Sequence, residues 1–353
     1  MKVVLEEFVP QGGHHCITNA VKQVFAYYGH PMTEAMIFGL GEGLDFTYVN
    51  LAHAPLVSGR SKTIDFEKIL AKNLGIDVQI KKSRIAEKAE AAAKKELSSG
   101  HPLLIYVDMA YLNYLQMEDA GHFGGHSIVL FGYDDENELF YVSDRDQTSQ
   151  PIHTPKGLMG SDYHLVGFEE IKCARSSRHR PFPANNQAVS FDLSNFKGVT
   201  EHMLIQAISN TCERMLFPEA KLKGISGIEK FSREIKRWSK FDSQKLQLAA
   251  VTNYFQINHR GGTGGGVFRK LFGTFLIESS NLLRQPILAE IGNAFVELAQ
   301  QWDRLADSLW VLSENGNVSA LLELSEVIYS LYQKELMLLN RLKKEIELFN
   351  KNM

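Results

Sequence analysis

The stretch Gln11-Gly-Gly-His-His-Cys16 runs directly into Ile17-Thr-Asn-Ala-Val-Lys-Gln-Val-Phe-Ala-Tyr-Tyr-Gly29, and it decides the fold of the first part of the chain. Apolar residues recur at positions 17, 20, 21, 24, 25 and 28, the spacing that gives a helix one buried face. Gly29, followed by Pro31, is a typical stop signal for such a helix. The sequence therefore predicts a core helix that begins at Cys16.

A thiol at a helix start is a candidate nucleophile. The unpaired amides and the positive dipole end favour an anion there, so the thiol is biased toward thiolate. Gln11 lies five residues upstream across two glycines, and its side-chain amide can join the Cys16 backbone N–H in stabilising an oxyanion. His15 is a candidate wall of this site. The alternative is that Cys16 is simply a small buried apolar residue.

A second informative stretch follows His122-Phe-Gly-Gly-His126. Two β-rich runs, 126–133 and 138–143, are joined by an acidic turn, which predicts a hairpin. His126 opens the first strand and Asp144 closes the second, so Asp144 can accept a hydrogen bond from His126 and fix its tautomer. With Cys16 these residues satisfy the logic of a catalytic triad. Asp146 is the alternative carboxylate, because a two-residue shift keeps a side chain on the same face of a strand.

Composition places the chain among ordinary globular proteins. Its 353 residues are long for one domain and comfortable for two, with 44% hydrophobic and 22% charged residues. A net charge of -3 disfavours nucleic acid or an anionic membrane as the main partner. The N-terminus shows no signal-peptide pattern and no apolar run is long enough to cross a bilayer, so we predict a cytoplasmic protein.

Cysteine and histidine usage does not favour a metal. The three cysteines, Cys16, Cys173 and Cys212, lack Cys-x-x-Cys spacing, which argues against a disulfide framework and a structural zinc site. Zinc bound by His14, His15, Cys16, His122 and His126 is disfavoured, because adjacent residues entering a helix do not easily converge on one ion. We predict no metal and no cofactor.

The fold class that these patterns predict is α+β. Residues 47–58 are expected to form a strand, 63–74 a helix and 103–107 a buried strand. After a short helix expected at 32–38, Gly39-Leu-Gly-Glu-Gly43 predicts a turned loop that does not match a nucleotide-binding pattern. Glu42 in this loop is a candidate ligand for a substrate amine, and a solvated carboxylate is the alternative.

We predict three segments: a catalytic domain at 1–175, a linker at 176–198 and an α-helical domain at 199–353. The linker follows from the basic, proline-rich stretch Cys173–Asn186. Its cationic side chains are candidates for contact with a carrier-protein phosphopantetheine or an acidic helix, against a solvated linker: Arg175, Arg178, His179 and Arg180. Beyond residue 199, long amphipathic patterns at 285–313 and 318–350 predict a helical bundle.

The glycine-rich run Arg260-Gly-Gly-Thr-Gly-Gly-Gly266 precedes a helix. Helix starts with glycines can bind anions, which makes Arg260, Thr263 and Arg269 candidate substrate-binding residues. The run lacks the Lys-Ser/Thr ending of a phosphate-binding loop. Close helix packing and a lid over the thiol are the alternatives.

The order of Gln, Cys on a helix, and His and Asp on consecutive strands resembles the papain-like cysteine fold, particularly the bacteriocin-leader peptidases. The run His15-Cys16, the segment Phe38–Phe46 and the stretch Gly125–Asp144 look more closely like the N-terminal domain of the butirosin biosynthesis protein H family. The resemblance covers roughly residues 1–150. It continues into a C-terminal helical domain of uncharacterised function, with Arg260–Arg269 and Phe275–Glu278 as a family signature.

This resemblance implies an acyltransferase of secondary metabolism, which moves an aminoacyl group from an acyl-carrier-protein thioester to an aminoglycoside amine. Cys16 would carry the acyl group, His126 would be the base and Asp144 its orienter. Gln11 is one residue closer to the cysteine than in papain-like peptidases. The implied partners are a small-molecule amine acceptor and an acyl carrier protein. A peptidase or amide hydrolase with the same site, and a non-catalytic binding protein, remain alternatives, and a homo-oligomer stays open.

Overall fold

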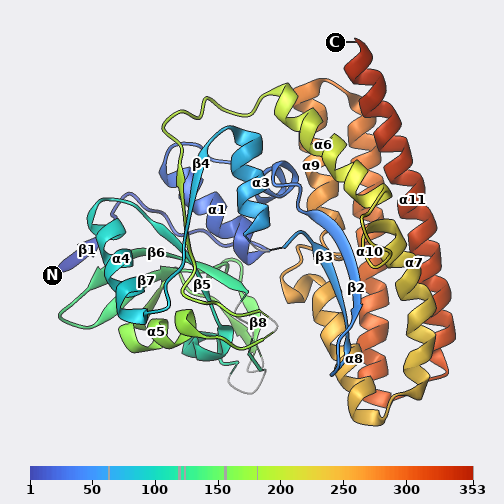
Figure 1. The fold of residues 1–353 in the computed structure, drawn as a ribbon, viewed down its shortest axis with the longest axis horizontal. Coiled ribbons are helices and arrows are strands. Elements are labelled where there is room, and N and C mark those ends of the chain that lie inside the picture. The colour runs from blue at the N-terminus through green and yellow to red at the C-terminus, as the bar shows by residue number, and fades with distance from the viewer. Residues whose placement is uncertain (63, 118–120, 123–124, 155–156, 181, 353) are drawn as a thin grey trace. The chain divides into compact units, whose positions relative to one another are not determined.

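The structure, a computed structural model, describes residues 1–353 except 63, 118–120, 123–124, 155–156, 181 and 353 (Figure 1). The chain forms two compact units. The first, here the sheet unit, comprises Met1–Ile37 and Gly75–Gly198. The second, here the helical unit, comprises Phe38–Leu74 and Val199–Met353, and the chain passes between them within helix α2 (Glu34–Leu40). The protein thus combines an N-terminal sheet with a helical C-terminal region, as the predicted α+β class requires.

In the described part of the sheet unit, seven strands form one antiparallel sheet in the order β10-β7-β6-β5-β11-β4, with β1 pairing with β6. Helix α1 packs on the central strands β6 and β5, α4 also contacts both of these strands, and α5 contacts β5 (Figure 1). A separate pair, β8 (Ile152–Thr154) and β9 (Gly157–Met159), lies outside this sheet. The bounds of the seven strands are β1 (Lys2–Val4), β4 (Asp77–Lys81), β5 (Leu103–Val107), β6 (His126–Asp134), β7 (Leu139–Ser143), β10 (His164–Gly167) and β11 (Ala188–Asp192).

The helix predicted from the opening stretch is confirmed. Helix α1 (Cys16–Tyr27) buries Ile17, Val21 and Val24, and Gly29 follows it with a left-handed φ of 81°. The hairpin predicted from the second stretch is also confirmed, as β6 and β7, and the buried strand at 103–107 is β5. The other helices of this unit are α4 (Ala86–Ser98), α5 (Phe168–Ser176) and the 3-10 turns η1 (Met109–Tyr111) and η2 (Asn113–Leu115).

The predicted linker at 176–198 needs correction, because it contains a strand of the main sheet. Strand β11 alternates Val189 and Phe191 with polar residues and is inserted between β5 and β4. Ala188 pairs with Ile105 on one side and with Lys81 on the other. The basic, proline-rich residues before it form a connection that returns the chain to the sheet rather than a spacer between domains.

The single strand predicted at 47–58 is instead a hairpin, β2 (Leu44–Asn50) and β3 (Pro55–Arg60). The helix predicted at 63–74 is α3 (Asp65–Leu74), and Thr63 lies outside the described residues. Both elements belong to the helical unit, so the predicted domain at 1–175 is interrupted. The physical reason is long-range pairing: Val57 donates its backbone N–H to Asn253 at 2.7 Å, and Tyr48 donates to Leu222 at 2.9 Å.

Two of the stretches that suggested the family resemblance pack together inside the helical unit. Gly39 lies against the ring of Phe275, where a Cβ would come within 2.0 Å of the ring. The rings of Phe38 and Phe268 stack at 5.5 Å between centroids. The segment from residue 38 therefore requires the helical unit for its packing, which explains why a piece of the first half of the sequence joins it.

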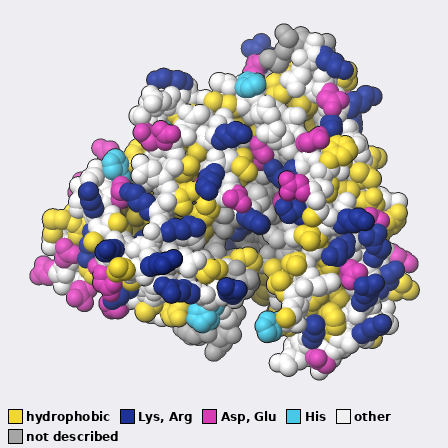
Figure 2. All heavy atoms as spheres, in the orientation of Figure 1, with side chains coloured by type: hydrophobic (Ala, Val, Ile, Leu, Met, Phe, Trp, Pro, Cys, Tyr) yellow, Lys and Arg dark blue, Asp and Glu magenta, His cyan; other side chains and the backbone are white. Residues whose placement is uncertain are grey.

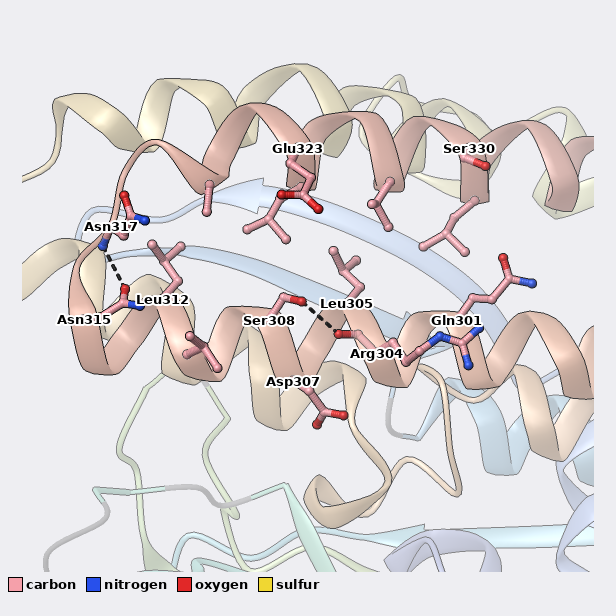
Figure 3. Close-up of a pocket in the computed structure, with 15 residues that line it drawn as sticks. Gln301, Arg304, Leu305, Asp307, Ser308, Leu312, Asn315, Asn317, Glu323 and Ser330 are labelled. Atoms are coloured by element: carbon pink, nitrogen blue, oxygen red, sulfur yellow. Dashed lines mark hydrogen bonds between the residues drawn. The ribbon is translucent and has the colours of Figure 1, made fainter.

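The rest of the helical unit is a bundle of long helices, and the predicted helices at 285–313 and 318–350 are confirmed. An open groove of about 650 Å³ runs between α10 and α11 (Figure 3), with Leu305 and Leu312 in its floor and Arg304, Asp307 and Glu323 along it. The bounds are α6 (Glu201–Leu216), α7 (Gly224–Glu234), η3 (Ile235–Lys240), α8 (Ser243–Ile257), η4 (His259–Gly261), α9 (Arg269–Leu283), α10 (Pro286–Asn315) and α11 (Ala320–Asn352).

Two further observations concern the charged surface and the character of the helices. Lysine and arginine side chains are spread over the face seen in Figure 2, with acidic and apolar side chains among them. Among the described helices, none combines the length and the apolar character needed to cross a membrane.

Candidate active site

Cys16 is the first residue of α1 and is partly exposed. The residue before it, His15, has an extended backbone and provides no side-chain cap for the helix. The first-turn amides of α1 therefore point toward the region around the thiol, and the side chain of His15 does not cap them. The positive end of the helix dipole lies in the same region. This is the environment that the sequence predicted for Cys16.

The chain leading to Cys16 is held by Glu34, a buried carboxylate in the first turn of α2. Its two oxygens accept the backbone N–H groups of His14 at 2.8 Å and His15 at 3.0 Å. One of them also accepts the Thr18 hydroxyl at 2.8 Å. Glu34 thereby fixes both the approach to α1 and its first turn. The sequence analysis missed this residue, since no spacing rule connects it with Cys16.

His126, the first residue of β6, is buried and lies between Cys16 and Asp144. Nε2 of His126 is 2.7 Å from Oδ2 of Asp144. The imidazole ring also forms a hydrogen bond with the side chain of Cys16. Because Nε2 is engaged with the carboxylate, Nδ1 is the ring nitrogen left for the thiol. Burial lowers the pKa of His126, but the charge and hydrogen bond of Asp144, with the Cys16 contact, outweigh it and raise this pKa to about 10.

Asp144 follows β7 and is fully buried at its side chain. Oδ2 accepts hydrogen bonds from His126 and from the Tyr114 hydroxyl, the latter at 2.9 Å, while Oδ1 accepts the Arg145 backbone N–H at 2.6 Å. Burial raises the pKa of Asp144, but the charge and hydrogen bond of His126, with the backbone N–H and the charge of Arg145, lower it to about 2. The pair therefore favours an ionised carboxylate beside a protonated imidazole.

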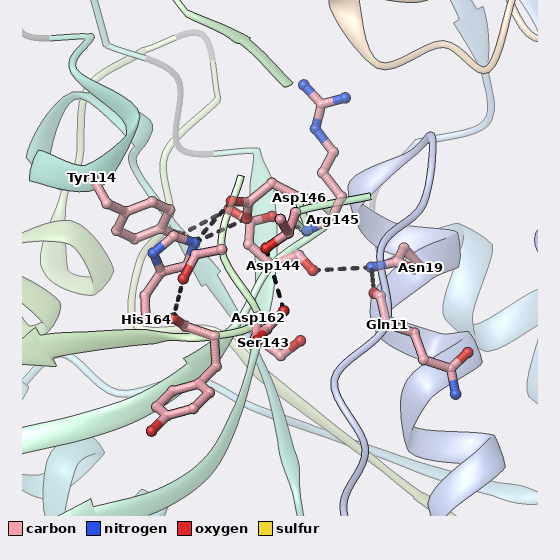
Figure 4. A network of polar contacts seen from close by, with 12 residues as sticks. Gln11, Asn19, Tyr114, Ser143, Asp144, Arg145, Asp146, Asp162 and His164 are labelled. Atoms are coloured by element: carbon pink, nitrogen blue, oxygen red, sulfur yellow. Dashed lines mark hydrogen bonds and ion pairs between the residues drawn. The ribbon is translucent and has the colours of Figure 1, made fainter. Parts of the chain in front are cut away.

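The alternative carboxylate, Asp146, has a different partner. Both of its oxygens contact Nε2 of His164, at 2.9 and 3.0 Å. Tyr114 connects the two pairs, because its ring stacks on His164 at 3.8 Å while its hydroxyl binds Asp144 (Figure 4). The structure thus brings Asp144, and not Asp146, against His126. Tyr114 was not found from the sequence, because it lies in the short 3-10 turn η2, which no sequence pattern had indicated.

Gln11 is anchored through its backbone. Its N–H donates to Oε1 of Gln23 at 2.9 Å, and its carbonyl accepts Nδ2 of Asn19 at 2.9 Å. Asn19 also donates to the Asp144 carbonyl at 3.2 Å, which ties the Gln11 segment to the strand end that carries the carboxylate. In Figure 4 the Gln11 side chain extends away from the Asp144 group. Its predicted contribution to an oxyanion site stays a prediction.

Two of the other histidines weighed as zinc ligands have structural contacts. His15 is buried, and its Nδ1 lies 3.3 Å from the Thr18 hydroxyl. His122 lies 2.9 Å from the buried carboxylate of Asp108, and its ring stacks on that of His179 at 3.4 Å. Among the described residues, no group of three or more His, Cys, Asp or Glu side chains is arranged to hold a metal ion.

Four of the candidate substrate-binding residues belong to the helical unit, and Glu42 there is not a solvated carboxylate. It is buried and forms an ion pair with Arg214 at 2.8 Å. Its Oε1 accepts Nδ2 of Asn73 at 3.1 Å and Nδ2 of Asn210 at 2.7 Å. This carboxylate is already occupied by the protein, so its expected role in binding a substrate amine is not supported by its contacts.

Arg269 likewise serves the protein interior. Its guanidinium is fully buried, binds Glu335 with a shortest contact of 2.6 Å, and donates to the carbonyls of Asp45 and Val267. The rings of Phe46 and Trp302 lie 5.5 and 5.7 Å from it. The interpretation of Arg269 as a substrate ligand is corrected, since its donors are satisfied within the fold.

The glycine-rich loop serves helix packing, one of the alternatives for it. Gly266 lies against the backbone of Ala299 on α10, where a Cβ would come within 2.3 Å, and its N–H donates to Asp303 at 3.0 Å. The Thr263 hydroxyl is buried and bonds the carbonyls of Ile257 and Asn258, both at 3.1 Å. Arg260 is exposed, and its guanidinium contacts the Tyr254 hydroxyl at 3.4 Å.

The sheet unit therefore carries a helix-borne thiol, an imidazole and a carboxylate in one hydrogen-bonded series, in a protein with a separate helical C-terminal region. Residues 15–145 match the family model described as "Butirosin biosynthesis protein H, N-terminal". Residues 169–342 match the one described as "Domain of unknown function (DUF4872)". The chain belongs to the butirosin biosynthesis protein H-like family with a separate C-terminal domain. No protein with a curated description matches the chain.

Proposed function

We propose that this protein is a cysteine-dependent acyltransferase that moves an acyl or aminoacyl group from a thioester donor to an amine through an acyl-enzyme on Cys16. The single observation that carries the proposal is the hydrogen-bonded series Cys16, His126, Asp144, with the thiol partly exposed and the other two groups buried. The family match supports a biosynthetic enzyme of the butirosin-related type. We also propose a papain-like arrangement for the sheet unit.

The proposed reaction starts from a Cys16 thiolate beside a His126 imidazolium. The sulfur attacks the thioester carbonyl carbon, and the bond between that carbon and the donor sulfur breaks. The donor thiolate leaves with the proton of His126. The amine then attacks the acyl-enzyme, His126 takes a proton from the amine, and Cys16 leaves as the thiolate. Asp144 holds the imidazole and balances its charge throughout, as its buried contact with Nε2 allows.

Charge that develops on the carbonyl oxygen needs donors. We assign this role to the Cys16 backbone N–H at the start of α1, supported by the helix dipole, and to the side-chain amide of Gln11. Glu34 would keep the Cys16 backbone in place through its bonds to the two preceding amides. A fixed donor geometry matters here, because misplacement of about 1 Å can cost roughly 10²-fold in rate.

The experiment is intact-protein mass spectrometry after incubation with a panel of acyl thioesters, including carrier-bound ones. The wild type should gain the mass of the acyl group, mapped to Cys16. Cys16→Ala should show no gain and His126→Ala a gain slowed by about 10²–10⁴-fold, the range for loss of a general base. Added amines should discharge the adduct faster than water does.

The outcomes separate the candidate functions. An adduct that water removes as fast as any amine would instead identify a hydrolase of amides or peptides using the same site. Absence of an adduct with every donor, together with a Cys16 thiol of ordinary reactivity, would exclude covalent catalysis and leave a non-catalytic binding protein.

A further inference from the structure

A cationic hollow of about 600 Å³ lies elsewhere in the sheet unit, at the ends of β4 and α5 and before β11. Lys82 and Arg84 come from the segment after β4, and Arg178 comes from the segment after α5. Asn185 and Asn186, just before β11, complete it. The residues that line the hollow include no Asp or Glu among those the structure describes. Its charge is therefore positive, although the whole chain carries a net charge of -3.

The segments that form this hollow are fastened to one another. The Asn186 side chain donates to the carbonyl of Ser83 at 3.1 Å, and its backbone N–H donates to the carbonyl of Arg175 at 2.6 Å. Asn185 donates its N–H to Ser177 at 3.1 Å. Both asparagines have a left-handed φ of 52°, a conformation that Asn tolerates better than most residues. The backbone of the hollow is thus built by specific contacts rather than left as a loose connection.

The three cations remain available. In the part of the chain that the structure describes, Lys82, Arg84 and Arg178 form no ion pair and no side-chain hydrogen bond, and all three are exposed. Elsewhere on the same elements, basic side chains are paired, as Lys81 is with Glu96 at 2.6 Å and Lys172 with Glu169 at 3.2 Å. A hollow with several unpaired cations suits an anion with multiple oxygens, such as a phosphate.

The register of the sheet places this hollow near the active site. His126 and Ile128 pair with Val107 and Ile105 on β5, Ile105 pairs with Ala188 on β11, and Ala188 pairs with Lys81 on β4. Lys81 therefore lies three strands from Ile128, which is roughly 15 Å at about 4.8 Å per strand. Lys81 directly precedes Lys82 of the hollow, and Ile128 is two residues from His126 on the same strand. The hollow thus begins roughly 15 Å from His126.

This separation matches a known class of donor. Thioesters made on pantetheine, whether in coenzyme A or on a carrier protein, carry a phosphate at the far end of the pantetheine arm from the reactive sulfur. An extended chain covers roughly 3.5 Å for every three backbone bonds, so an arm about four residues long reaches roughly 14 Å. A phosphate in the hollow could thus accompany a thioester carbonyl at Cys16.

We propose that Lys82, Arg84 and Arg178 form the phosphate subsite for a phosphopantetheine thioester donor. This inference rests on the proposed function for its biological meaning, but binding can be measured without catalysis. The test is isothermal titration calorimetry of the full chain carrying Cys16→Ala with two probes, 4′-phosphopantetheine and pantetheine, which differ only in the phosphate. The phosphorylated probe should bind at least about tenfold more tightly, as expected for charge-assisted hydrogen bonds.

The double variant Lys82→Ala/Arg178→Ala should remove that difference, while Arg178→Lys should retain part of it. Lys197→Ala, an exposed lysine outside the hollow, is the matched control and should bind like the parent. Equal affinity for the two probes, or a phosphate preference that survives in the double variant, would overturn the assignment. Raised salt should weaken only the phosphorylated probe, because the subsite is exposed.

Coenzyme A and a carrier protein, tested with and without its phosphopantetheine, identify the source of the phosphate. Tighter binding of coenzyme A than of 4′-phosphopantetheine would favour the free cofactor, and tighter binding of the modified carrier would favour the protein-bound donor. Acylation of Cys16 by phosphate-free thioesters without phosphopantetheine binding would refute this inference and leave the proposed function intact. Phosphopantetheine binding without any acylation of Cys16 would support this inference and refute the proposed function.

Discussion

The His126–Asp144 pair of the sheet unit and the Arg269–Glu335 pair of the helical unit are both buried charge pairs, and they leave different groups available for chemistry. In the helical unit, Arg269 donates to Glu335 and to two backbone carbonyls, and its guanidinium lies over Phe46 and Trp302. In the sheet unit, Asp144 uses one ring nitrogen of His126, and the ring also bonds the partly exposed Cys16.

The difference shows what separates a structural charge pair from one suited to catalysis. A buried ion pair gives little net stability over an apolar replacement, yet it is costly to break on one side only. Arg269 and Glu335 neutralise each other's charge, and Arg269 holds the segment around Asp45 in place through its carbonyl. The attraction between His126 and Asp144 also offsets the cost of burying their charges, but this pair in addition sets the protonation state of His126, a group that can react. The difference between the two pairs is therefore the third, reactive partner, Cys16.

The largest effect that we predict is on the free energy of unfolding, and it tests the structural role of the Arg269–Glu335 pair. Arg269→Met leaves Glu335 buried without a partner and should destabilise the protein by about 3–5 kcal/mol. The double variant Arg269→Met/Glu335→Leu removes both charges and should recover most of that loss. Urea denaturation followed by circular dichroism measures both. A single variant within about 1 kcal/mol of the wild type would show that the pair is not the structural element described here.

The next effect distinguishes the two carboxylates after β7. Asp144→Asn should reduce the rate of Cys16 acylation by about 10²–10³-fold, because His126 loses the charge that stabilises its imidazolium. Asp146→Asn is the matched control, since Asp146 contacts His164, and it should change the rate by less than about threefold. Single-turnover mass spectrometry gives both rates. Equal losses in the two variants would mean that the site cannot be assigned to one aspartate.

A smaller effect is expected from Tyr114→Phe, which keeps the ring on His164 and removes the hydroxyl that binds Asp144. Hydrogen bonds to charged groups contribute about 1.5–3 kcal/mol, so the acylation rate should fall by roughly 10- to 100-fold. The pH at which the rate declines on the alkaline side should also shift, because Asp144 has lost a donor. A rate change with an unmoved pH profile would point to a packing role for Tyr114 alone.

The pH dependence of stability should differ between the two pairs. The pKa of His126 is raised from 6.5 to about 10, so its contribution is complete below pH 6.5 and is lost as the pH rises through about 10. The pKa of Asp144 is lowered from 3.8 to about 2, so its contribution is present above pH 3.8 and is lost as the pH falls through about 2.

The difference in unfolding free energy between the wild type and Asp144→Asn should therefore shrink by about 1 kcal/mol or more between pH 7 and 9. The difference between the wild type and Arg269→Met should stay nearly constant over that range, because both proteins keep the His126–Asp144 pair. Urea titrations at both pH values test this. A constant difference for Asp144→Asn would contradict the protonated state assigned to His126.

Local sequence patterns predicted the parts of this molecule that depend on neighbours in the chain. The apolar spacing after Cys16 predicted α1, and the alternation around the acidic turn predicted the hairpin that carries His126 and Asp144. Once these elements were fixed, the pairing of His126 with a carboxylate at the end of β7 followed from antiparallel geometry. These residues could be found because the functional groups lie at the ends of regular elements.

What the sequence did not reveal depends on contacts between distant segments. The hairpin at β2 and β3 joins the helical unit through Asn253, nearly 200 residues away along the chain. Strand β11 was hidden by the basic, proline-rich residues before it, although its own alternation is regular. Arg269 looked like a ligand because it follows glycines, but its buried partner Glu335 lies on α11. No local pattern identifies such partners.

The measurement that tests the central claim most directly is the rate at which iodoacetamide alkylates each cysteine at pH 6, followed by peptide mass spectrometry. All three cysteines carry thiols rather than disulfides, so exposed Cys173 is an internal reference and buried Cys212, whose pKa burial raises to about 12, should stay unmodified. We expect Cys16 to react at least about tenfold faster than Cys173, and to lose this advantage in His126→Ala. A Cys16 that reacts no faster than Cys173, with or without His126, would contradict the catalytic account.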